Sequence, residues 1–115
     1  MEFQNVYKPE GYLIDTDQNK YYTSSLHMLE KAMKNGIILE GIAKMCDCTN
    51  MSLGLDFGFC HGIIPRDEAM TASAGSKDIA IISRVGKPVC FKVKAIIREN
   101  GNPVAILSRK AAQEE

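Results

Sequence analysis

Two lysines spaced two residues apart form the pair of side chains in this sequence best suited to chemistry with an anion. Lys92 and Lys94 lie in an alternating apolar–polar segment, so both would project from the same face of a strand. Ammonium groups in such a row can follow the phosphates of a nucleic acid, and they can equally form an ordinary solvated strand face. Other basic side chains of the same region are Arg66, Arg84, Lys87, Arg98, Arg109 and Lys110.

The overall charge restricts what these cations can do. Fourteen Lys and Arg residues balance fourteen Asp and Glu residues, so the formal net charge is zero. A dedicated nucleic-acid-binding domain usually carries a clear positive excess. Any binding of a polyanion must therefore depend on a local patch of basic side chains and not on the charge of the whole molecule.

Three cysteines and a histidine could be zinc ligands, but their spacing is unfavourable. One residue separates Cys46 from Cys48, whereas zinc knuckles place about two to four residues between paired ligands. Cys60 and His61 are adjacent and would point to opposite faces of a strand. We expect no bound metal and no cofactor, and we expect the thiols, including that of Cys90, to be reduced.

Neither histidine has a partner in the sequence that would mark a catalytic site. His27 lies in a helical segment and His61 precedes a glycine in a strand-like one, without a recognisable nucleophile–base pair. We therefore expect no enzymatic activity. The sequence has no apolar run of the ~20 residues that a membrane helix needs, and its N-terminus lacks the apolar core of an export signal. These features favour a cytoplasmic protein without membrane contact.

Residues 24–36 show the clearest helical pattern. A Thr-Ser-Ser segment supplies the N-terminal cap, and Asn35-Gly36 supplies a left-handed stop. The apolar residues at helical spacing are Leu26, Leu29, Met33 and Ile37. The preceding polar stretch, rich in turn residues, predicts an arm that packs on the domain through its aromatic side chains, which are Phe3, Tyr7, Tyr12, Tyr21 and Tyr22.

After Gly36 the pattern changes to that of short strands. The predicted strands are 37–45, 53–57, 61–64, 89–94 and 104–107. Glu99-Asn100-Gly101-Asn102 predicts a tight hairpin turn, since Asn-Gly tolerates positive φ angles. Residues 65–87 form a linker with a helical turn near its start and a small-residue loop, Thr71–Ser76. Five short strands predict a small closed barrel, because closure removes exposed sheet edges.

Four segments of the predicted barrel resemble the S-one RNA-binding domain, the repeated barrel module named after the largest protein of the small ribosomal subunit. In chain order they are Glu40-Gly41-Ile42-Ala43, Leu55–Gly58 with His61–Pro65, Val85-Gly86-Lys87-Pro88-Val89 and Ala105-Ile106-Leu107-Ser108-Arg109-Lys110. Their order and spacing are compatible with that family. The resemblance implies a mostly β, five-stranded oligonucleotide-binding (OB-fold) barrel with an N-terminal helical extension. The implied division is 1–36 for the arm and helix, 37–110 for the barrel and 111–115 for a polar tail.

The resemblance also implies where a nucleic acid would lie, across the second and third strands of the barrel. The family's two stacking aromatics fall on Met51 and Gly54 of this sequence, and its third-strand histidine falls on Pro65. The residues expected to contact nucleic acid are Met51, Phe59, His61, Arg66, Lys92, Lys94 and Arg109. Phe57 falls in the buried phase of its strand and is expected to pack in the core.

The function implied by the resemblance is that of a non-catalytic RNA-binding or single-stranded nucleic-acid-binding module in translation or RNA metabolism. Because the modules of this family occur in tandem, binding is expected to be weak alone and shared with neighbouring modules. The alternative is a barrel that has lost RNA binding and serves in protein–protein contact or assembly, with the N-terminal arm and helix as the docking element.

Overall fold

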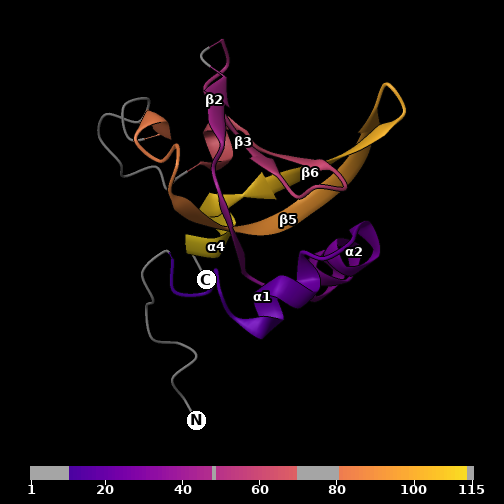
Figure 1. Cartoon of the computed structure of the whole chain (residues 1–115). Helices are drawn as coiled ribbons and strands as arrows, with labels where there is room; N and C mark the ends of the chain where they lie inside the picture. The colour runs from indigo at the N-terminus through magenta and orange to yellow at the C-terminus, as the bar shows by residue number, and fades with distance from the viewer. Residues whose placement is uncertain (1–10, 48, 70–80, 114–115) are drawn as a thin grey trace.

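The computed structural model describes residues 11–47, 49–69 and 81–113 (Figure 1). The chain contains mostly strands, with short helices at its start and end. The elements are α1 (Asp17–Tyr22), α2 (Leu26–Asn35), β1 (Leu39–Ile42), β2 (Met45–Asp47), β3 (Ser52–Asp56), β4 (His61–Ile64), η2 (Arg66–Glu68), β5 (Pro88–Glu99), β6 (Asn102–Ser108) and α4 (Arg109–Gln113).

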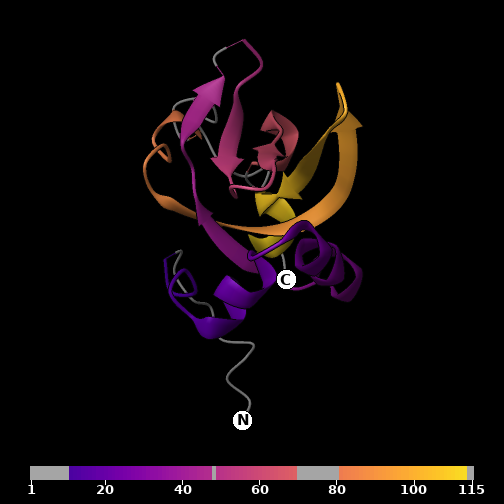
Figure 2. The same cartoon turned by 45° about the vertical axis from the view of Figure 1, so that its right-hand side comes forward.

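The six strands form one curled sheet in the order β1-β5-β6-β4-β3-β2. All pairs are antiparallel except β4 with β6. The two outermost strands, β1 and β2, are consecutive in the chain, so residues 43 and 44 join both ends of the sheet. Figure 2 shows the resulting curl. The predicted fold class is confirmed: the chain forms an OB-fold-like barrel with an N-terminal helical extension, and β1 and β2 are two parts of one first strand.

Backbone hydrogen bonds mark the point at which this first strand changes neighbours. The Ala43 N–H donates to the Lys87 carbonyl at 3.1 Å, on the side of β5. The next residue, Lys44, donates its N–H to the Gly54 carbonyl of β3 at 2.8 Å. The strand therefore passes from β5 to β3 within a single residue, which allows a short strand to close a barrel.

The barrel interior follows the alternation predicted from the sequence. Val89, Phe91 and Val93 are buried, as are Leu53 and Leu55 of β3. The interior is tightly filled beside Gly62 of β4. A Cβ on Gly62 would lie 2.8 Å from atoms of both the Leu107 and the Phe57 side chains, so a larger residue there would require these side chains to shift. Phe57 itself makes an edge contact with Phe91 at a centroid distance of 5.9 Å and packs against the core.

The predicted helix is confirmed as α2, with the expected caps. The Ser25 hydroxyl accepts a hydrogen bond from the Met28 N–H, and the chain leaves the helix at Gly36 with φ 63°. Its buried residues, Leu29 and Ala32, belong to the cluster that includes the buried residues of β5. Figure 1 shows α1 and α2 together on one side of β5, away from β2 and β3.

Helix α1 was not predicted. It replaces part of the expected arm and begins behind Thr16, whose hydroxyl accepts a hydrogen bond from the Asn19 N–H at 3.2 Å. A helix of six residues has too few turns to display an apolar period and is not stable alone in water. It depends on tertiary contacts that the local sequence does not reveal.

The strongest of these contacts joins Asn19 to β1. One edge of β1 pairs with β5, and the other edge faces α1. The Asn19 side-chain amide donates to the Glu40 carbonyl at 3.0 Å, and its oxygen accepts from the Glu40 N–H at 2.7 Å. This amide therefore replaces a neighbouring strand at the free edge. The Glu40 carboxylate accepts from the N–H groups of Gly11 and Leu13 at 3.0 Å and so holds the preceding segment.

The remaining segments correspond to the sequence prediction where they are described. The helical turn after Pro65 is η2, and the polar tail is helical as α4 up to Gln113. Ile81 is buried whereas Ile82 is 48% exposed. Among the described helices, none is long and apolar enough to cross a membrane. The predicted loop Thr71–Ser76, the aromatic residues Phe3 and Tyr7, and Cys48 lie outside the described residues.

We expect Asn19→Ala to lower the free energy of unfolding by about 1–3 kcal/mol, because it leaves a buried peptide group of Glu40 without its partner. Gln18→Ala is the matched control, since Gln18 is the adjacent, exposed residue of the same helix. Urea denaturation measures both changes. Equal and small effects of the two substitutions would show that the Asn19 amide does not stabilise the edge of β1.

Candidate nucleic-acid interface

An open groove with a volume of about 540 Å³ lies on the outer face of the sheet over β2, β3 and β4. Met45, Gly54 and Ile63 are aligned in register across the three strands, so they share this outer face. The groove is lined by Lys44, Met45, Asp47, Ser52, Leu53, Gly54, Leu55, Asp56, His61, Gly62 and Ile63. It therefore crosses the second and third strands of the barrel, which are β3 and β4.

The floor of the groove is apolar. A Cβ on Gly54 would lie 3.0 Å from Met45 Cγ, so the methionine side chain lies over the space that a larger residue would fill. Met45 is nevertheless 60% exposed, and Ile63 beside Gly54 is half-buried. Thioether and aliphatic groups at such a position offer a polarisable surface to a flat ligand.

The rim of the groove carries charges of both signs. Lys44 and His61 are exposed on it, and so are Asp47 and Asp56. Each aspartate also accepts a hydrogen bond from a backbone N–H two residues further along, at 2.9 Å for Asp47 and 2.8 Å for Asp56. These carboxylates help to shape the two turns beside the groove. The rim is therefore mixed in charge, in agreement with the zero net charge of the chain.

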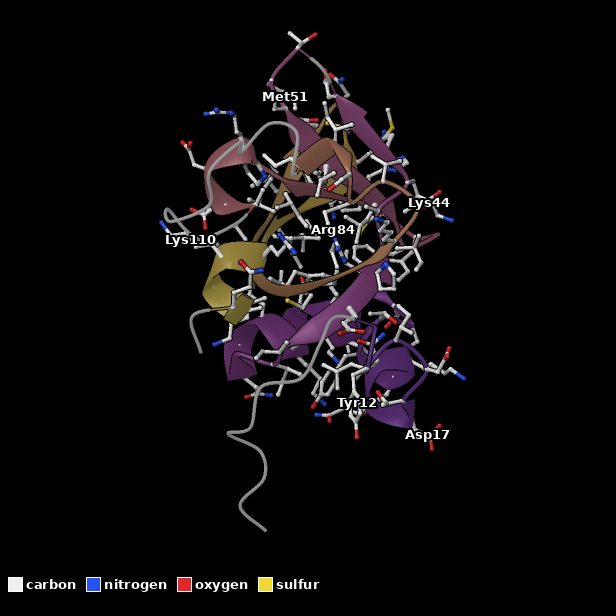
Figure 3. The ribbon with its side chains drawn as sticks, turned by 90° about the vertical axis from the view of Figure 1, so that its left-hand side faces the viewer. Tyr12, Asp17, Lys44, Met51, Arg84 and Lys110 are labelled. Atoms are coloured by element: carbon white, nitrogen blue, oxygen red, sulfur yellow. The ribbon has the colours of Figure 1, made fainter. Side chains whose placement is uncertain are left out.

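Of the predicted site residues, only His61 lines this groove. It begins β4, where it pairs with Asp56 of β3 and Val104 of β6. Met51 lies in the turn before β3 with φ 56°, in the upper part of the molecule in Figure 3. Phe59 is half-buried and stacks on Phe57 with ring centroids 5.9 Å apart. The structure therefore places Met51 and Phe59 outside the groove lining.

The predicted basic residues lie elsewhere on the barrel. Lys92 and Lys94 are in β5, and the Lys94 ammonium group forms an ion pair with Glu68 at 3.3 Å. Lys92 is half-buried and pairs with Ser108 of β6, and Arg66 is exposed at the start of η2. Figure 3 shows Lys110, from α4 in this region, on the opposite side of the molecule from Lys44.

Arg109 requires a correction. It was predicted to contact nucleic acid, but it is only 6% exposed and its guanidinium group donates to the Ala69 carbonyl at 3.0 Å. This contact joins α4 to the segment after η2. Because Arg109 is buried, little of its surface is accessible to a ligand. The arginine of the Ala105–Lys110 motif therefore has a structural role in this chain.

Glu68 connects the same elements through its side chain. Its carboxylate accepts from the Ser108 hydroxyl at 2.6 Å, and that hydroxyl accepts from the Ala111 N–H at 2.8 Å. The Ser108 hydrogen bond, and then the Lys94 ammonium group, lower the pKa of Glu68. Glu68, Lys94 and Ser108 thus form a structural cluster that fixes η2 against the end of β6.

Lys44, Met45 and Ile63 line the groove but were not among the predicted site residues. Their assignment needs the register of β2 against β3, which places Met45 opposite Gly54. The prediction ended the first strand at Met45 and did not extend it into the hairpin. A cross-strand pairing of the segments on either side of the turn at 49–51 was the signal that could have identified these residues.

Three of the four thiols lie in the part of the chain that the structure describes. No disulfide joins Cys46, Cys60 and Cys90 to one another. Burial, and then the nearby Asp56 carboxylate, raise the pKa of the Cys60 thiol. Within the described ranges no group of three or more His, Cys, Asp or Glu side chains is placed to hold a metal ion. Cys48, the fourth cysteine of the zinc hypothesis, lies outside those ranges.

Comparison with known proteins finds a similar fold among the solved structures. The chain is similar to GSP13 from Bacillus subtilis, known from a solution structure, with 26% sequence identity and a TM-score of 0.51. The match covers 70% of this chain and 58% of GSP13, so this chain spans less than two thirds of that protein. No protein-family model and no curated protein matches the chain. The likeness supports the OB-fold assignment.

Acid should reduce the contribution of Glu68 to stability. The pKa of Glu68 is lower in the folded chain than in the unfolded one. The charged carboxylate therefore stabilises the fold at any pH above the pKa of the unfolded chain. This stabilisation is lost as the pH falls through the pKa of the folded chain. We expect Glu68→Gln to lower the melting temperature by a few degrees at pH 7. At a pH well below 4.5, the ordinary pKa of a glutamate, the difference in melting temperature between the variant and the parent protein should become smaller. Asp67→Asn, at the adjacent exposed residue, is the control. A difference that stayed constant with pH would refute the charge-dependent role.

Proposed function

We propose that this chain is a non-catalytic module that binds single-stranded nucleic acid, with RNA as the ligand, through the groove over β2, β3 and β4. The observation that carries the proposal is the position of the groove. OB-folds bind oligonucleotides across the face of their second and third strands, and those strands are β3 and β4 here. The ordered motifs that resemble the S-one domain support RNA as the ligand and a role in translation or RNA metabolism.

Contact with bases is the main contribution that this groove offers. Stacking on aromatic platforms is worth about 1–3 kcal/mol per base, and it tolerates any base because every base has a flat face. In this groove the flat surface consists of the Met45 thioether and the Ile63 side chain on either side of Gly54. Such a floor can contact a base without an aromatic ring, but it contributes less binding free energy per base than aromatic stacking does.

Contact with phosphates is limited to few groups. Lys44 and His61 can each meet a phosphate at the rim, whereas Asp47 and Asp56 repel it. The proposal therefore includes weak binding by this module alone and a shallow dependence on salt, with a slope near −0.7 for each phosphate neutralised on a single strand. Neighbouring modules of a longer protein would add affinity by raising the effective concentration.

A second candidate function rests on an apolar row that continues beyond the groove. Ala95, Ile106, Ile63, Gly54 and Met45 are in register across five neighbouring strands, β5, β6, β4, β3 and β2. They share the outer face of the sheet. A continuous apolar row of this kind also suits a protein surface, so a barrel that serves in assembly is the alternative to nucleic-acid binding.

A titration with single-stranded RNA separates the two functions. We expect a short oligouridylate to bind the intact chain at low salt, and Lys44→Glu to weaken this binding about three- to tenfold, because it replaces attraction at the rim by repulsion. Lys31→Glu makes the same charge change on the exposed face of α2, outside the groove, and should have a much smaller effect.

Fluorescence anisotropy over a range of salt concentrations is the measurement. The complete absence of binding by the parent protein at low salt would exclude the nucleic-acid function and favour the assembly function. Equal losses in the two variants would show that the ligand responds to the overall charge and not to the groove.

A further inference from the structure

A second hollow lies between α1 and the barrel and has a volume of about 280 Å³. This is close to the lower end of ligand pockets, which run from about 300 to 1,000 Å³. Its lining shares three residues with the groove, namely Lys44, Leu55 and Asp56. The two hollows therefore meet at the residue where the first strand passes from β5 to β3.

The strand path explains why this hollow exists. β3 pairs with β2 only from Ser52 to Gly54, so Leu55 and Asp56 extend beyond that pairing. β1 has meanwhile turned away to pair with β5. The gap between β1 and β3 is covered by α1, and the two hydrogen bonds of Asn19 with Glu40 hold this helix in place. The hollow is thus a fixed part of the fold.

The side chains around the hollow combine apolar and basic groups. Ile14, Ile42 and the half-buried Phe57 provide apolar and aromatic surface. Lys20 is exposed on α1, and Lys44 is exposed on the barrel side. Figure 3 shows Lys44 on the same side of the molecule as Asp17, the first residue of α1. A hollow lined by aromatic and aliphatic side chains and by two lysines has the chemistry that a nucleotide requires.

The buried carboxylate beside the hollow does not oppose an anion strongly. Glu40 is 3% exposed, and both its carboxylate oxygens accept hydrogen bonds from backbone N–H groups of residues 11 and 13. Its charge is therefore partly compensated by the peptide dipoles that it holds. The exposed carboxylate of Asp56 stands at the junction of the two hollows, where it shapes the turn at Gly58.

We propose that the hollow beneath α1 is a second subsite for single-stranded nucleic acid, into which a strand lying in the groove continues past Lys44. One nucleotide occupies it, with its base against Ile42 and Phe57 and with Lys20 as the phosphate contact contributed by α1. The helical extension is then part of the binding surface. This inference rests on the proposed function of the groove.

Oligouridylates of two lengths test the subsite. A short strand of about three nucleotides fills the groove, whereas one of about eight reaches the hollow, within the roughly 4–16 nucleotides that a single OB-fold covers. We expect the parent protein to bind the longer strand more tightly. Lys20→Gln should weaken binding of the longer strand about two- to fivefold and reduce its salt slope by ~0.7, while binding of the short strand is unchanged. Lys34→Gln, on the exposed face of α2, is the matched control.

The outcomes distinguish the two proposals. If neither strand binds the parent protein, the function proposed for the groove is wrong and the subsite has no ligand. If both strands bind but Lys20→Gln acts no differently from Lys34→Gln, the groove remains and the subsite is refuted. Circular dichroism of each variant verifies that α1 and the barrel are intact, because Lys20 is an exposed side chain whose replacement should not affect folding.

Discussion

The rest of this structure depends on one constraint, which is that a single first strand must pair with two different neighbours. It bonds to β5 up to Ala43 and to β3 from Lys44 onward, and this exchange converts an open sheet into a curled barrel. Among the residues that the structure describes, no strand pairs with the outer edge of β1. Asn19 satisfies the buried peptide group of Glu40 there, so a side chain of the six-residue helix α1 makes the hydrogen bonds that a neighbouring strand would make. The helical extension therefore completes the hydrogen bonding at this edge of the sheet.

The same exchange creates the surfaces on which a ligand could lie. Where β2 pairs with β3, the glycine at position 54 leaves a shallow apolar floor beneath Met45. Where β1 has departed from β3, the gap becomes the hollow beneath α1. The polar cluster of Glu68, Lys94 and Ser108 lies at the end of β6 and stabilises the fold there. None of these three residues lines the groove over β2, β3 and β4.

The sequence predicted the parts of the fold that local patterns determine. Alternation identified the buried faces of β3 and β5, and capping residues delimited α2. It did not predict α1, because the contact that stabilises this helix joins residues 19 and 40, far apart in the chain. The same limit applies to the candidate site. The residue type of Arg109 is that of a phosphate contact, and only the tertiary structure shows that its guanidinium group is buried against Ala69.

The central claim is that nucleic acid lies on the outer face of β2, β3 and β4. Mapping of backbone amide chemical shifts during titration with a short single-stranded RNA tests this claim most directly. If the nucleic acid lies in the groove, the largest shifts occur at Met45, Gly54 and Ile63, with small shifts at Lys94 and Arg109. If the largest shifts occurred at Lys94 and Arg109, with none across the groove, binding on the outer face of β2, β3 and β4 would be contradicted. The binding site would then lie at the basic residues that were predicted from the sequence.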